Sequence, residues 1–541
     1  MNDRNVPRAG EVAGRRAAWL GLARVPGRVW LIGVIALAVG AVATALAVNQ
    51  SSHAARGTGA RHAAARAHAT VTITGNASML GVPASFLGFS TEYWALPLFE
   101  HHMARFARIL TLERVPGDGP LVVRIGGDST DHALFDVNVA RLPKGLFELT
   151  PRWFRQARVL IAHVDARTLL DLNLVTDLPR NAAQWARAAE MQLPRGSILG
   201  YEIGNEPDLY NPRNFLPIFS PIMSELEIRL FPHSLAARTY VHLYLSYARA
   251  LARYAPHAPL VAPVIAYPTR DLGWIKRLLR SPHPRLRMIS AHMYPYSACA
   301  RPGGRLYPTI PKILSEKATA GMARSLRPAI RVSHHAGLPF RLTELNSVTC
   351  GGVAGVSNTF STALWAPDAL FELVRAHVDG VNVHVRAFAI NAAFSLTRRG
   401  LVARPLLYGL TLFTRTLGAD PHLVRVDLRA KRSAHLKVWA VRVRGGLLHV
   451  LLINKGRHAV TAGLGLPSTG AASVERLLAP SAAATSGMTL DGQRLGPDDR
   501  WRGRAATERI VAGRNGYEVR VPRWSAALVT VSVAAGALPL P

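Results

Sequence analysis

Eight short apolar runs, separated by segments with helical periodicity, constrain the fold of this chain more than any other feature. The runs are nearly continuous in apolar residues, as parallel strands buried on both faces are. They cover Ser85–Trp94, Leu121–Gly127, Thr168–Asp177, Ile198–Glu206, Leu260–Tyr267, Met288–Tyr296, Phe340–Ser347 and Gly380–Val385. Between them, apolar residues recur every three or four positions, for example at Phe99, Met103, Phe106 and Leu110. We therefore predict a (β/α)8 barrel. An open doubly wound sheet is the alternative, and it is less favoured because such a sheet does not usually need eight strands.

The chain changes character after the last predicted helix, Pro405–Leu417. Downstream, apolar strands alternate with turn-rich connections, and no helical period is evident. The strands are predicted at Leu436–Val443, Leu447–Asn454, Tyr517–Val521 and Ala526–Val533. This pattern predicts a barrel domain over residues 70–419 and a β-sandwich domain over residues 420–541. A short strand at Thr70–Thr74 is expected to join the second domain, because it precedes the barrel and has no barrel partner.

The N-terminal region carries a membrane signal. Residues 29–48 are uncharged for 20 residues, which matches one membrane span. Arginines precede this run and only Asp3 and Glu11 oppose them, so the positive-inside rule leaves the N-terminus in the cytoplasm. We expect a cytoplasmic tail at 1–28, an anchor at 29–48 and a flexible tether at 49–69, with the rest of the chain outside. Secretion after cleavage of a signal near Ala45-Leu46-Ala47 is the alternative.

The chain is strongly basic, with 65 lysines and arginines against 33 acidic residues and a formal net charge of +32. Beyond the N-terminal tail these cations are spread singly or in pairs. No finger, RNP or basic-zipper pattern appears, so no nucleic-acid partner is expected. A positive surface does concentrate anionic polymers. No group of His, Cys and Asp has the spacing of metal ligands, so we expect neither a metal nor another cofactor.

The two cysteines follow strands that are neighbours in the predicted barrel. Cys299 comes after the sixth run and Cys350 after the seventh. Their loops would meet at the same rim, so a Cys299–Cys350 disulfide is predicted for an exported protein. Two free, buried thiols are the alternative.

Two of the apolar runs end on a glutamate. Glu206 lies in ILGYEIGNEPDLY (198–210), where Pro207 cannot continue a central strand, and Glu344 lies in FRLTELNSVTCGG (340–352). A buried carboxylate needs partners or a proton, so it is costly unless it is used. Two carboxyl groups at two strand ends are the minimum equipment for glycoside hydrolysis. The alternative for each glutamate alone is a helix cap or a pair with one of the many arginines.

Further polar residues stand at the ends of the other runs, where barrel enzymes place their chemistry. They are Glu92, Asp128, Asn205, His292, Tyr294 and His384. Sugar hydroxyls need hydrogen-bond donors and acceptors at fixed positions, so a polar rim favours a carbohydrate pocket. For His384 alone a structural role is favoured, and for Asp128 a loop cap after Gly126-Gly127 is the alternative.

In these motifs the chain resembles the retaining glycosidases of the large (β/α)8 clan. More narrowly, it is similar to glycoside hydrolase family 79, the heparanase and β-glucuronidase family. The resemblance covers about residues 80–536. Its matching pieces are RIGGDSTD at Arg124–Asp131, EIGNEPD at Glu202–Asp208, HMY at His292–Tyr294 and TELNSVTCGG at Thr343–Gly352.

The resemblance implies a role for each matching residue. Glu206 would be the general acid/base and Glu344 the nucleophile. The implied substrate contacts are Asn205 to the 2-hydroxyl, Glu92 and Asp128 to other hydroxyls, His292 and Tyr294 beside Glu344, and the Gly351 N–H to the C6 carboxylate of a uronic acid. At Thr349 the family commonly carries Tyr, so a shorter hydroxyl stands there.

The sequence thus predicts a membrane-anchored, outward-facing retaining β-glycosidase of the β-glucuronidase type, acting on a uronic-acid glycan or glycoside. Another activity of the clan, β-glucosidase or β-xylosidase, is one alternative, and a non-catalytic carbohydrate-binding surface protein is another. The loop with Thr349, Gly351 and Gly352 contains no arginine. With Tyr294 and Tyr296 it predicts uronate recognition by neutral donors and some tolerance of neutral sugars.

Overall fold

The computed structural model describes residues 67 to 540, except 116, 140, 388, 398, 399 and 469. Eight parallel strands close into a barrel, which confirms the predicted barrel and excludes the open sheet. The strands are β3 (Leu87–Glu92), β4 (Val122–Gly126), β7 (Arg167–Leu172), β8 (Ile198–Ile203), β9 (Leu260–Ile265), β10 (Leu286–Met293), β12 (Phe340–Leu345) and β14 (Gly380–His384). Around the ring they run in the order β10-β12-β14-β3-β4-β7-β8-β9.

Each of the eight predicted runs overlaps a barrel strand, but every strand ends earlier than its run does. The fourth run was expected to reach Glu206, and β8 ends at Ile203. The sixth was expected to reach Tyr296, and β10 ends at Met293. In each case the last residues leave the barrel ladder and turn into the loops of one rim.

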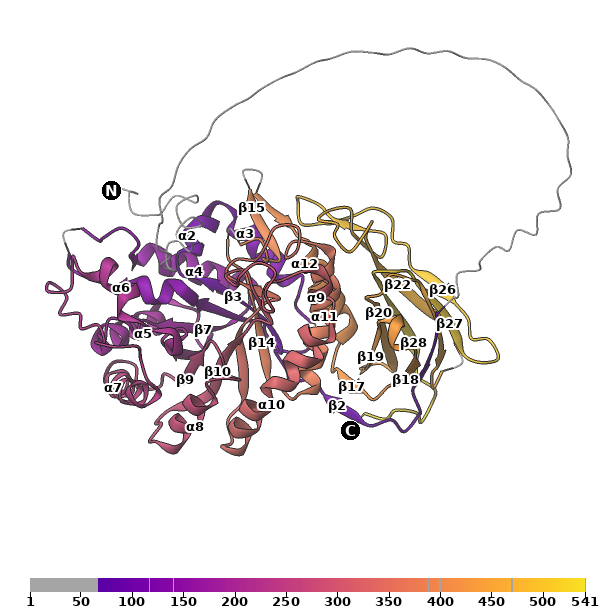
Figure 1. The fold of residues 1–541 in the computed structure, drawn as a ribbon, viewed down its shortest axis with the longest axis horizontal. Coiled ribbons are helices and arrows are strands. Elements are labelled where there is room, and N and C mark those ends of the chain that lie inside the picture. Colours follow the sequence, from indigo (N-terminus) through magenta and orange to yellow (C-terminus); the bar gives the residue numbers. More distant parts are fainter. Residues whose placement is uncertain are drawn as a thin grey trace, which may run out of the picture.

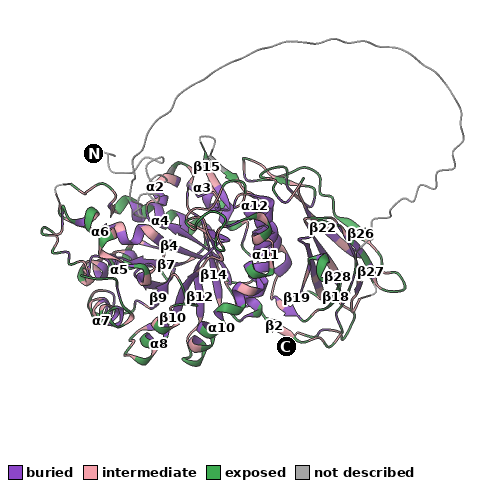
Figure 2. Cartoon of the chain, viewed as in Figure 1, coloured by how far each residue is buried: buried purple, intermediate pink, exposed green. Residues whose placement is uncertain are grey.

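Helices cover the outside of the barrel, and most of them have a buried face on the strands and an exposed face in solvent (Figure 2). In α4, Thr150 caps the first turn by accepting from the Trp153 N–H at 3.3 Å, and Pro151 occupies the first helical position. The barrel helices are α2 (Ala95–Phe99), α3 (Met103–Thr111), α4 (Pro151–Val164), α5 (Pro179–Gln192), α6 (Pro212–Phe219), α7 (Ala237–Tyr254), α8 (Leu272–Arg280), α9 (Ile310–Ile313), α10 (Ala320–His335), α11 (Phe360–Arg375) and α12 (Pro405–Leu417).

Short elements decorate the rim where the strands end. A 3-10 helix, η3 (Gly127–His132), follows β4, and another, η4 (Pro207–Leu209), follows β8. Three small strand pairs lie in the loops: β5 (Ala133–Phe135) with β6 (Phe147–Leu149), β11 (Tyr296–Ser297) with β13 (Val348–Thr349), and β15 (Phe394–Thr397) with β16 (Gly400–Ala403).

A second domain of mainly antiparallel sheet follows the barrel, as predicted (Figure 1). Its larger sheet contains β2 (Met79–Gly81), β17 (His422–Val424), β19 (Leu436–Val443), β20 (Leu447–Asn454), β28 (Ser525–Ser532), β22 (Ala472–Leu478), β23 (Thr489–Leu490) and β26 (Glu508–Ile510). Its smaller sheet contains β18 (Asp427–Ala430), β1 (Ala67–Thr72), β21 (Val460–Gly465) and β27 (Tyr517–Val521). Strands β1 and β2 precede the barrel in sequence and yet pair in this domain. Three residues are too few to show periodicity, so β2 had no sequence signal.

The larger sheet is buried on both faces because of strand alternation. In β20, Val450 and Leu452 belong to the apolar core shared with the smaller sheet, whereas Leu451 and Ile453 belong to the core shared with the barrel. Helices α11 and α12 lie between the barrel strands and this sheet (Figure 1). The second domain is therefore packed against the barrel.

The predicted anchor at 29–48, with the tail and nearly all of the tether, lies outside the described residues. Among the helices that the structure describes, none is both long and apolar enough to span a membrane.

Candidate active site

Glu206 stands at a sharp turn directly after β8. Gly204 has a φ of +83°, and a Cβ there would meet the Leu174 side chain at 2.9 Å, so this position needs glycine. Glu206 itself has a φ of +51°, which is unusual for a residue with a side chain. Its N–H donates to the carbonyl of Val264, in β9, at 3.0 Å. The turn thus fixes the backbone of Glu206 and leaves its side chain 22% exposed.

Glu344 lies near the end of β12 and is held by donors in β4 and β14 and by one directly after β10. Arg124 Nη1 donates to Oε1 at 2.6 Å, and the Tyr294 hydroxyl donates to Oε2 at 2.6 Å. His384 Nδ1 lies 2.9 Å from the same Oε2. Burial raises the pKa of Glu344, but the charges of His384 and Arg124 outweigh it, and the pKa stays well below its usual value. Glu344 is therefore an oriented, ionised carboxylate.

Beneath Glu344 lies a buried group of charges, which we call the rim cluster: Arg124, Asp171 and Glu202. Arg124 Nε donates to Glu202 at 2.7 Å and to Asp171 at 3.0 Å. Arg124 Nη2 donates to Oδ1 of Asn205 at 3.0 Å. One guanidinium thus reaches both the residue before Glu206 and the carboxylate of Glu344.

Two glycines make room for these carboxylates. A Cβ at Gly126 would lie 2.0 Å from an Asp171 oxygen, and one at Gly127 would lie 2.9 Å from a Glu92 oxygen. The Gly127 N–H donates to Asp171 at 3.1 Å. The Gly-Gly pair at the end of β4 is therefore required by close approach of acidic side chains, and Asp128, which follows it, lines the pocket.

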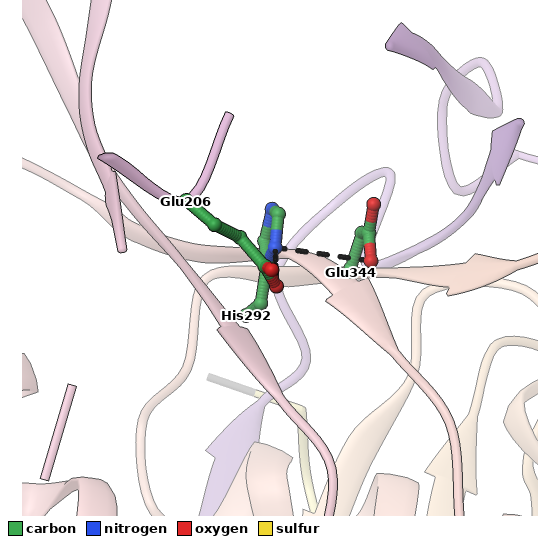
Figure 3. Close-up of side chains that lie close together, drawn as sticks. All are labelled: Glu206, His292 and Glu344. Carbon is green, nitrogen blue, oxygen red and sulfur yellow. Dashed lines mark hydrogen bonds and ion pairs between the residues drawn. The ribbon is translucent and has the colours of Figure 1, made fainter. Parts of the chain in front are cut away.

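Glu206 and Glu344 approach each other on either side of His292 (Figure 3). His292 Nδ1 lies 2.9 Å from Glu206 Oε1 and 3.8 Å from Glu344 Oε2. One oxygen of each carboxyl group and one His292 nitrogen all lie within 4.8 Å of one another. Such a triad can also hold a divalent cation. However, Glu344 already accepts from Arg124 and Tyr294, so the arrangement fits an acid and nucleophile pair better than a metal centre.

Two ionised groups adjoin this pair. His384 Nε2 lies 3.6 Å from Glu92 Oε1. Burial would lower the pKa of His384, but the adjacent carboxylates of Glu344 and Glu92 raise it to about 9. Burial would raise the pKa of Glu92, but His384 and Arg386 lower it to about 2. His384, expected to be structural, is therefore an imidazolium in contact with Glu344.

The loop after β12 is joined to the loop after β10 by a disulfide. Cys299 and Cys350 are bonded, with their Cα atoms 5.9 Å apart. Cys350, Gly351 and Gly352 have successive φ values of +58°, +76° and +87°. A Cβ at Gly352 would meet Ser357 at 2.8 Å, whereas one at Gly351 would meet nothing within 4 Å. The bond thus braces a tightly turned loop beside the pocket.

These elements surround one pocket at the carboxyl rim. It is lined by Asp128, Glu206, Tyr294, Glu344, Thr349, Cys350, Gly351, His384, Arg386, Ala389 and Asn391. Glu92, Asn205 and His292 are predicted site residues that lie behind this lining; all three are buried. Tyr296, which we expected to supply a donor to the pocket, lies away from the pocket lining. It is buried and its hydroxyl donates to the carbonyl of Lys312 at 3.1 Å, because it belongs to the short strand β11.

Sequence reasoning missed four contributors: Arg124, Asp171, Glu202 and Arg386. The first three had a signal, since each is a charged residue inside an otherwise apolar strand of the barrel. Arg386 had none, because it follows β14 in a loop that carries no recognised motif.

Comparison with known proteins gives related glycoside hydrolases. Residues 438–528 match the glycosyl hydrolase family 79 C-terminal beta domain. The chain is 24% identical over 517 residues to a β-glucuronidase of Aspergillus niger, an alignment that covers 82% of this chain and 90% of that protein.

Solved structures share the fold. A 4-O-α-L-rhamnosyl-β-D-glucuronidase of Fusarium oxysporum 12S, solved with Rha-GlcA, matches with a TM-score of 0.69 and 17% identity over 85% of this chain and 100% of that one. A GH51 arabinofuranosidase of Xanthomonas axonopodis pv. citri matches with a TM-score of 0.60 and 13% identity over 86% and 100%. With the motifs and the barrel, these matches make the chain a β-glucuronidase-like glycoside hydrolase whose C-terminal domain is that of family 79.

Proposed function

We propose that the chain is a retaining β-glucuronidase in which Glu344 is the nucleophile and Glu206 the general acid/base. The observation that carries this proposal is the separation of the two carboxyl groups, which have oxygens within 4.8 Å of each other. Retaining glycosidases hold the pair about 5–5.5 Å apart, whereas inverting ones leave about 6.5–9.5 Å for a water molecule. The short distance supports double displacement.

In the first step, an oxygen of Glu344 attacks the anomeric carbon and the bond to the leaving oxygen breaks. Glu206 gives its proton to that oxygen, so the aglycone departs as a neutral alcohol. In the second step, Glu206 takes a proton from water, the water oxygen attacks the same carbon, and the ester bond to Glu344 breaks. The sugar leaves with the configuration it had at the start.

The surrounding residues prepare both glutamates. Arg124, Tyr294 and His384 keep Glu344 ionised and aim it, which is what a nucleophile needs. His292 Nδ1 holds Glu206 in either state: it accepts from the protonated carboxyl group or donates to the carboxylate. Arg124 occupies the Asn205 oxygen, so the Asn205 amide nitrogen is the donor left for the substrate 2-hydroxyl.

The substrate class follows from the relatives and from the pocket. The Aspergillus niger protein is a β-glucuronidase, and the Fusarium oxysporum structure contains Rha-GlcA. In this chain Thr349 and the Gly351 backbone line the pocket as donors for a C6 carboxylate, while Glu92 and Asp128 are acceptors for sugar hydroxyls. We also retain the anchor at 29–48 as part of this proposal, so that proteolysis of intact cells should release the described domains.

A panel of 4-nitrophenyl β-glycosides tests the activity, with the glucuronide, glucoside and xyloside compared at equal concentration. The glucuronide should give the highest kcat/KM. Glu206→Gln should retain turnover of a dinitrophenyl glycoside, whose leaving group needs no proton, and lose that of an alkyl glycoside. Glu518→Gln, on the exposed edge of β27, is the matched control. If Glu206→Gln loses activity equally on both leaving groups, Glu206 is not the acid.

A further inference from the structure

We propose that Arg386 is the specificity-determining residue that pairs with the C6 carboxylate of the uronic acid. This inference rests on the proposed function, since it concerns the sugar that Glu344 attacks. It also replaces the expectation that neutral donors on the Thr349–Gly351 loop recognise the carboxylate alone. The chemical class selected is an anionic hexuronic acid over a neutral hexose or pentose.

Arg386 is built into the pocket wall beside that loop. It lies two residues after β14, and its side chain is only 16% exposed. Downstream in the same loop, the Ile390 N–H donates to the carbonyl of Gly351 at 2.8 Å, and the Asn391 N–H lies 3.3 Å from the same oxygen. Arg386 and Gly351 both line the pocket, so a ligand held by one is within the field of the other.

The negative charge around the pocket must be offset by a cation if an anionic sugar is to bind. Glu92, Asp128, Glu206 and Glu344 are four carboxyl groups at or directly behind its wall. An anionic sugar is repelled by such a site unless positive charge offsets the repulsion. His384 is already shared between Glu344 and Glu92. Arg124 is fully buried and bonded to the rim cluster, so it has no surface to offer.

Arg386 has the geometry for this task. Its Nη1 lies 3.3 Å from Asp128 and its Nε lies 3.9 Å from Glu92, so both contacts are long for charged groups. Its guanidinium also lies over the ring of Trp94, with 5.6 Å between Cζ and the ring centroid, which restricts its position. A guanidinium fork held in this way can bind a carboxylate through two parallel N–H donors, which a lysine cannot do.

A neutral sugar and a uronic acid differ at C6 and share their other hydroxyl contacts. The ratio of kcat/KM for 4-nitrophenyl β-D-glucuronide to that for the β-D-glucoside therefore isolates the carboxylate. In Arg386→Gln this ratio should fall about 10- to 100-fold, the range for one charged hydrogen-bonded contact. Arg386→Lys should give an intermediate ratio. Arg331→Gln, which removes an exposed charge on α10, should keep the wild-type ratio.

Calorimetric titration of the full chain with D-glucuronate and with D-glucose provides a readout that does not need turnover. Wild type should bind glucuronate more tightly, and Arg386→Gln should lose that preference. A parallel fall for both sugars, in kcat/KM or in binding, would show that Arg386 only positions Asp128 and Glu92 and would overturn the inference. If wild type cleaves neither glycoside yet binds glucuronate through Arg386, the proposed function fails and this inference stands.

Discussion

Two buried clusters of charge in the described part of the chain differ in where they lie: one is beneath the pocket, and the other is between the barrel and the second domain. The rim cluster of Arg124, Asp171 and Glu202 lies under Glu344. The other, which we call the interface cluster, joins α11 to the second domain. It consists of Asp368, Glu372, Lys437 and Lys455, with Lys437 2.8 Å from Glu372 and Lys455 bonded to Asp368.

The two clusters differ in balance. The interface cluster sets Lys437 and Lys455 against Asp368 and Glu372, with Glu316 and Arg375 adding one charge of each sign at its edge. The Trp439 indole donates to Asp368 at 3.0 Å as well. The rim cluster sets the Arg124 guanidinium against Asp171 and Glu202, while Glu344 above it contacts both Arg124 and His384. Burial raises the pKa of Asp171 well above its usual range, whereas at Glu202 the charge of Arg124 outweighs burial and lowers the pKa. We infer that the interface cluster, whose charges are balanced, stabilises the contact between the two domains. The rim cluster, whose charges are not balanced, supports the catalytic carboxylates.

The largest expected effect separates the clusters by activity. Glu344→Gln should reduce kcat by more than ~10⁴-fold, because the nucleophile is lost. Some stability should be lost as well, because the lowered pKa of Glu344 means that His384 and Arg124 favour its charged form in the folded state. Steady-state kinetics and calorimetry on the same preparation measure both. A folded Glu344→Gln protein with more than a hundredth of wild-type kcat would contradict this assignment.

The reverse pattern is expected at the interface cluster. Asp368→Asn leaves Lys455 buried without its carboxylate, which should cost about 3–5 kcal/mol of unfolding free energy. Burial is outweighed at Asp368 by the two lysines, which lower its pKa, so this stability should also disappear as pH falls toward that lowered pKa. Urea unfolding measures the loss, and kcat of the folded protein should stay unchanged. Asp498→Asn, in an exposed pair with Arg502, is the control and should change little.

The disulfide sharpens the comparison, because it belongs to the rim. Replacing both Cys299 and Cys350 by Ser opens a loop whose ends are 51 positions apart in sequence, and stability should fall by about 2–4 kcal/mol. Unlike Asp368→Asn, this change should also raise KM, since it frees the loop that carries Gly351. If KM stays constant while the unfolding midpoint falls, the disulfide braces the fold without shaping the pocket.

The smallest expected effect concerns a buried carboxyl group outside both clusters. Glu113 lies after α3 and meets two threonines of α12; Thr411 is 2.6 Å and Thr414 is 3.3 Å away. Burial raises the pKa of Glu113 to about 8. The folded state therefore binds this proton more tightly than the unfolded state, and stability should decrease as pH rises from about 4.5 to about 8.

Glu113→Gln removes that titration. Its unfolding free energy should exceed that of wild type at pH 8 by about 1–3 kcal/mol, because the amide needs no desolvated charge. The difference should shrink toward pH 5, because Glu113 is protonated there in the folded state and the unfolded state, with a pKa of 4.5, begins to bind the proton as well. Urea unfolding at the two pH values measures it. A wild-type protein that is more stable than Glu113→Gln at pH 8 would mean that Glu113 is buried as a carboxylate.

The sequence was most informative where a local pattern and the final fold agree. All eight barrel strands and the helix at Pro405–Leu417 were predictable from apolar periodicity, and Glu206 and Glu344 from the way their strands end. The second-domain strands β19, β20 and β27 were found with their observed bounds. These features depend on short stretches of chain, so the sequence of each stretch contains the information that predicts it.

Features that depend on contacts between distant segments were missed or undervalued. Strand β2 is defined by its pairing with β17, more than 300 residues away in sequence. His384 looks like an ordinary core histidine until β14 closes the barrel next to β12 and brings it to Glu344. Arg386 belongs to no recognised motif, and its role is suggested by the pocket that it lines. Arg124, Asp171 and Glu202 are charged residues inside barrel strands. Their presence there was a usable signal that a count of apolar residues overlooks.

The central claim, that Glu206 and Glu344 act by double displacement, is tested most directly by the configuration of the first-formed product. Proton NMR can follow the anomeric signal during the early turnover of 4-nitrophenyl β-D-glucuronide, before mutarotation mixes the anomers. The carboxyl separation within 4.8 Å predicts that β-glucuronic acid appears first and the α anomer only later. If α-glucuronic acid appears first, the reaction inverts, and the roles given to Glu206 and Glu344 are wrong.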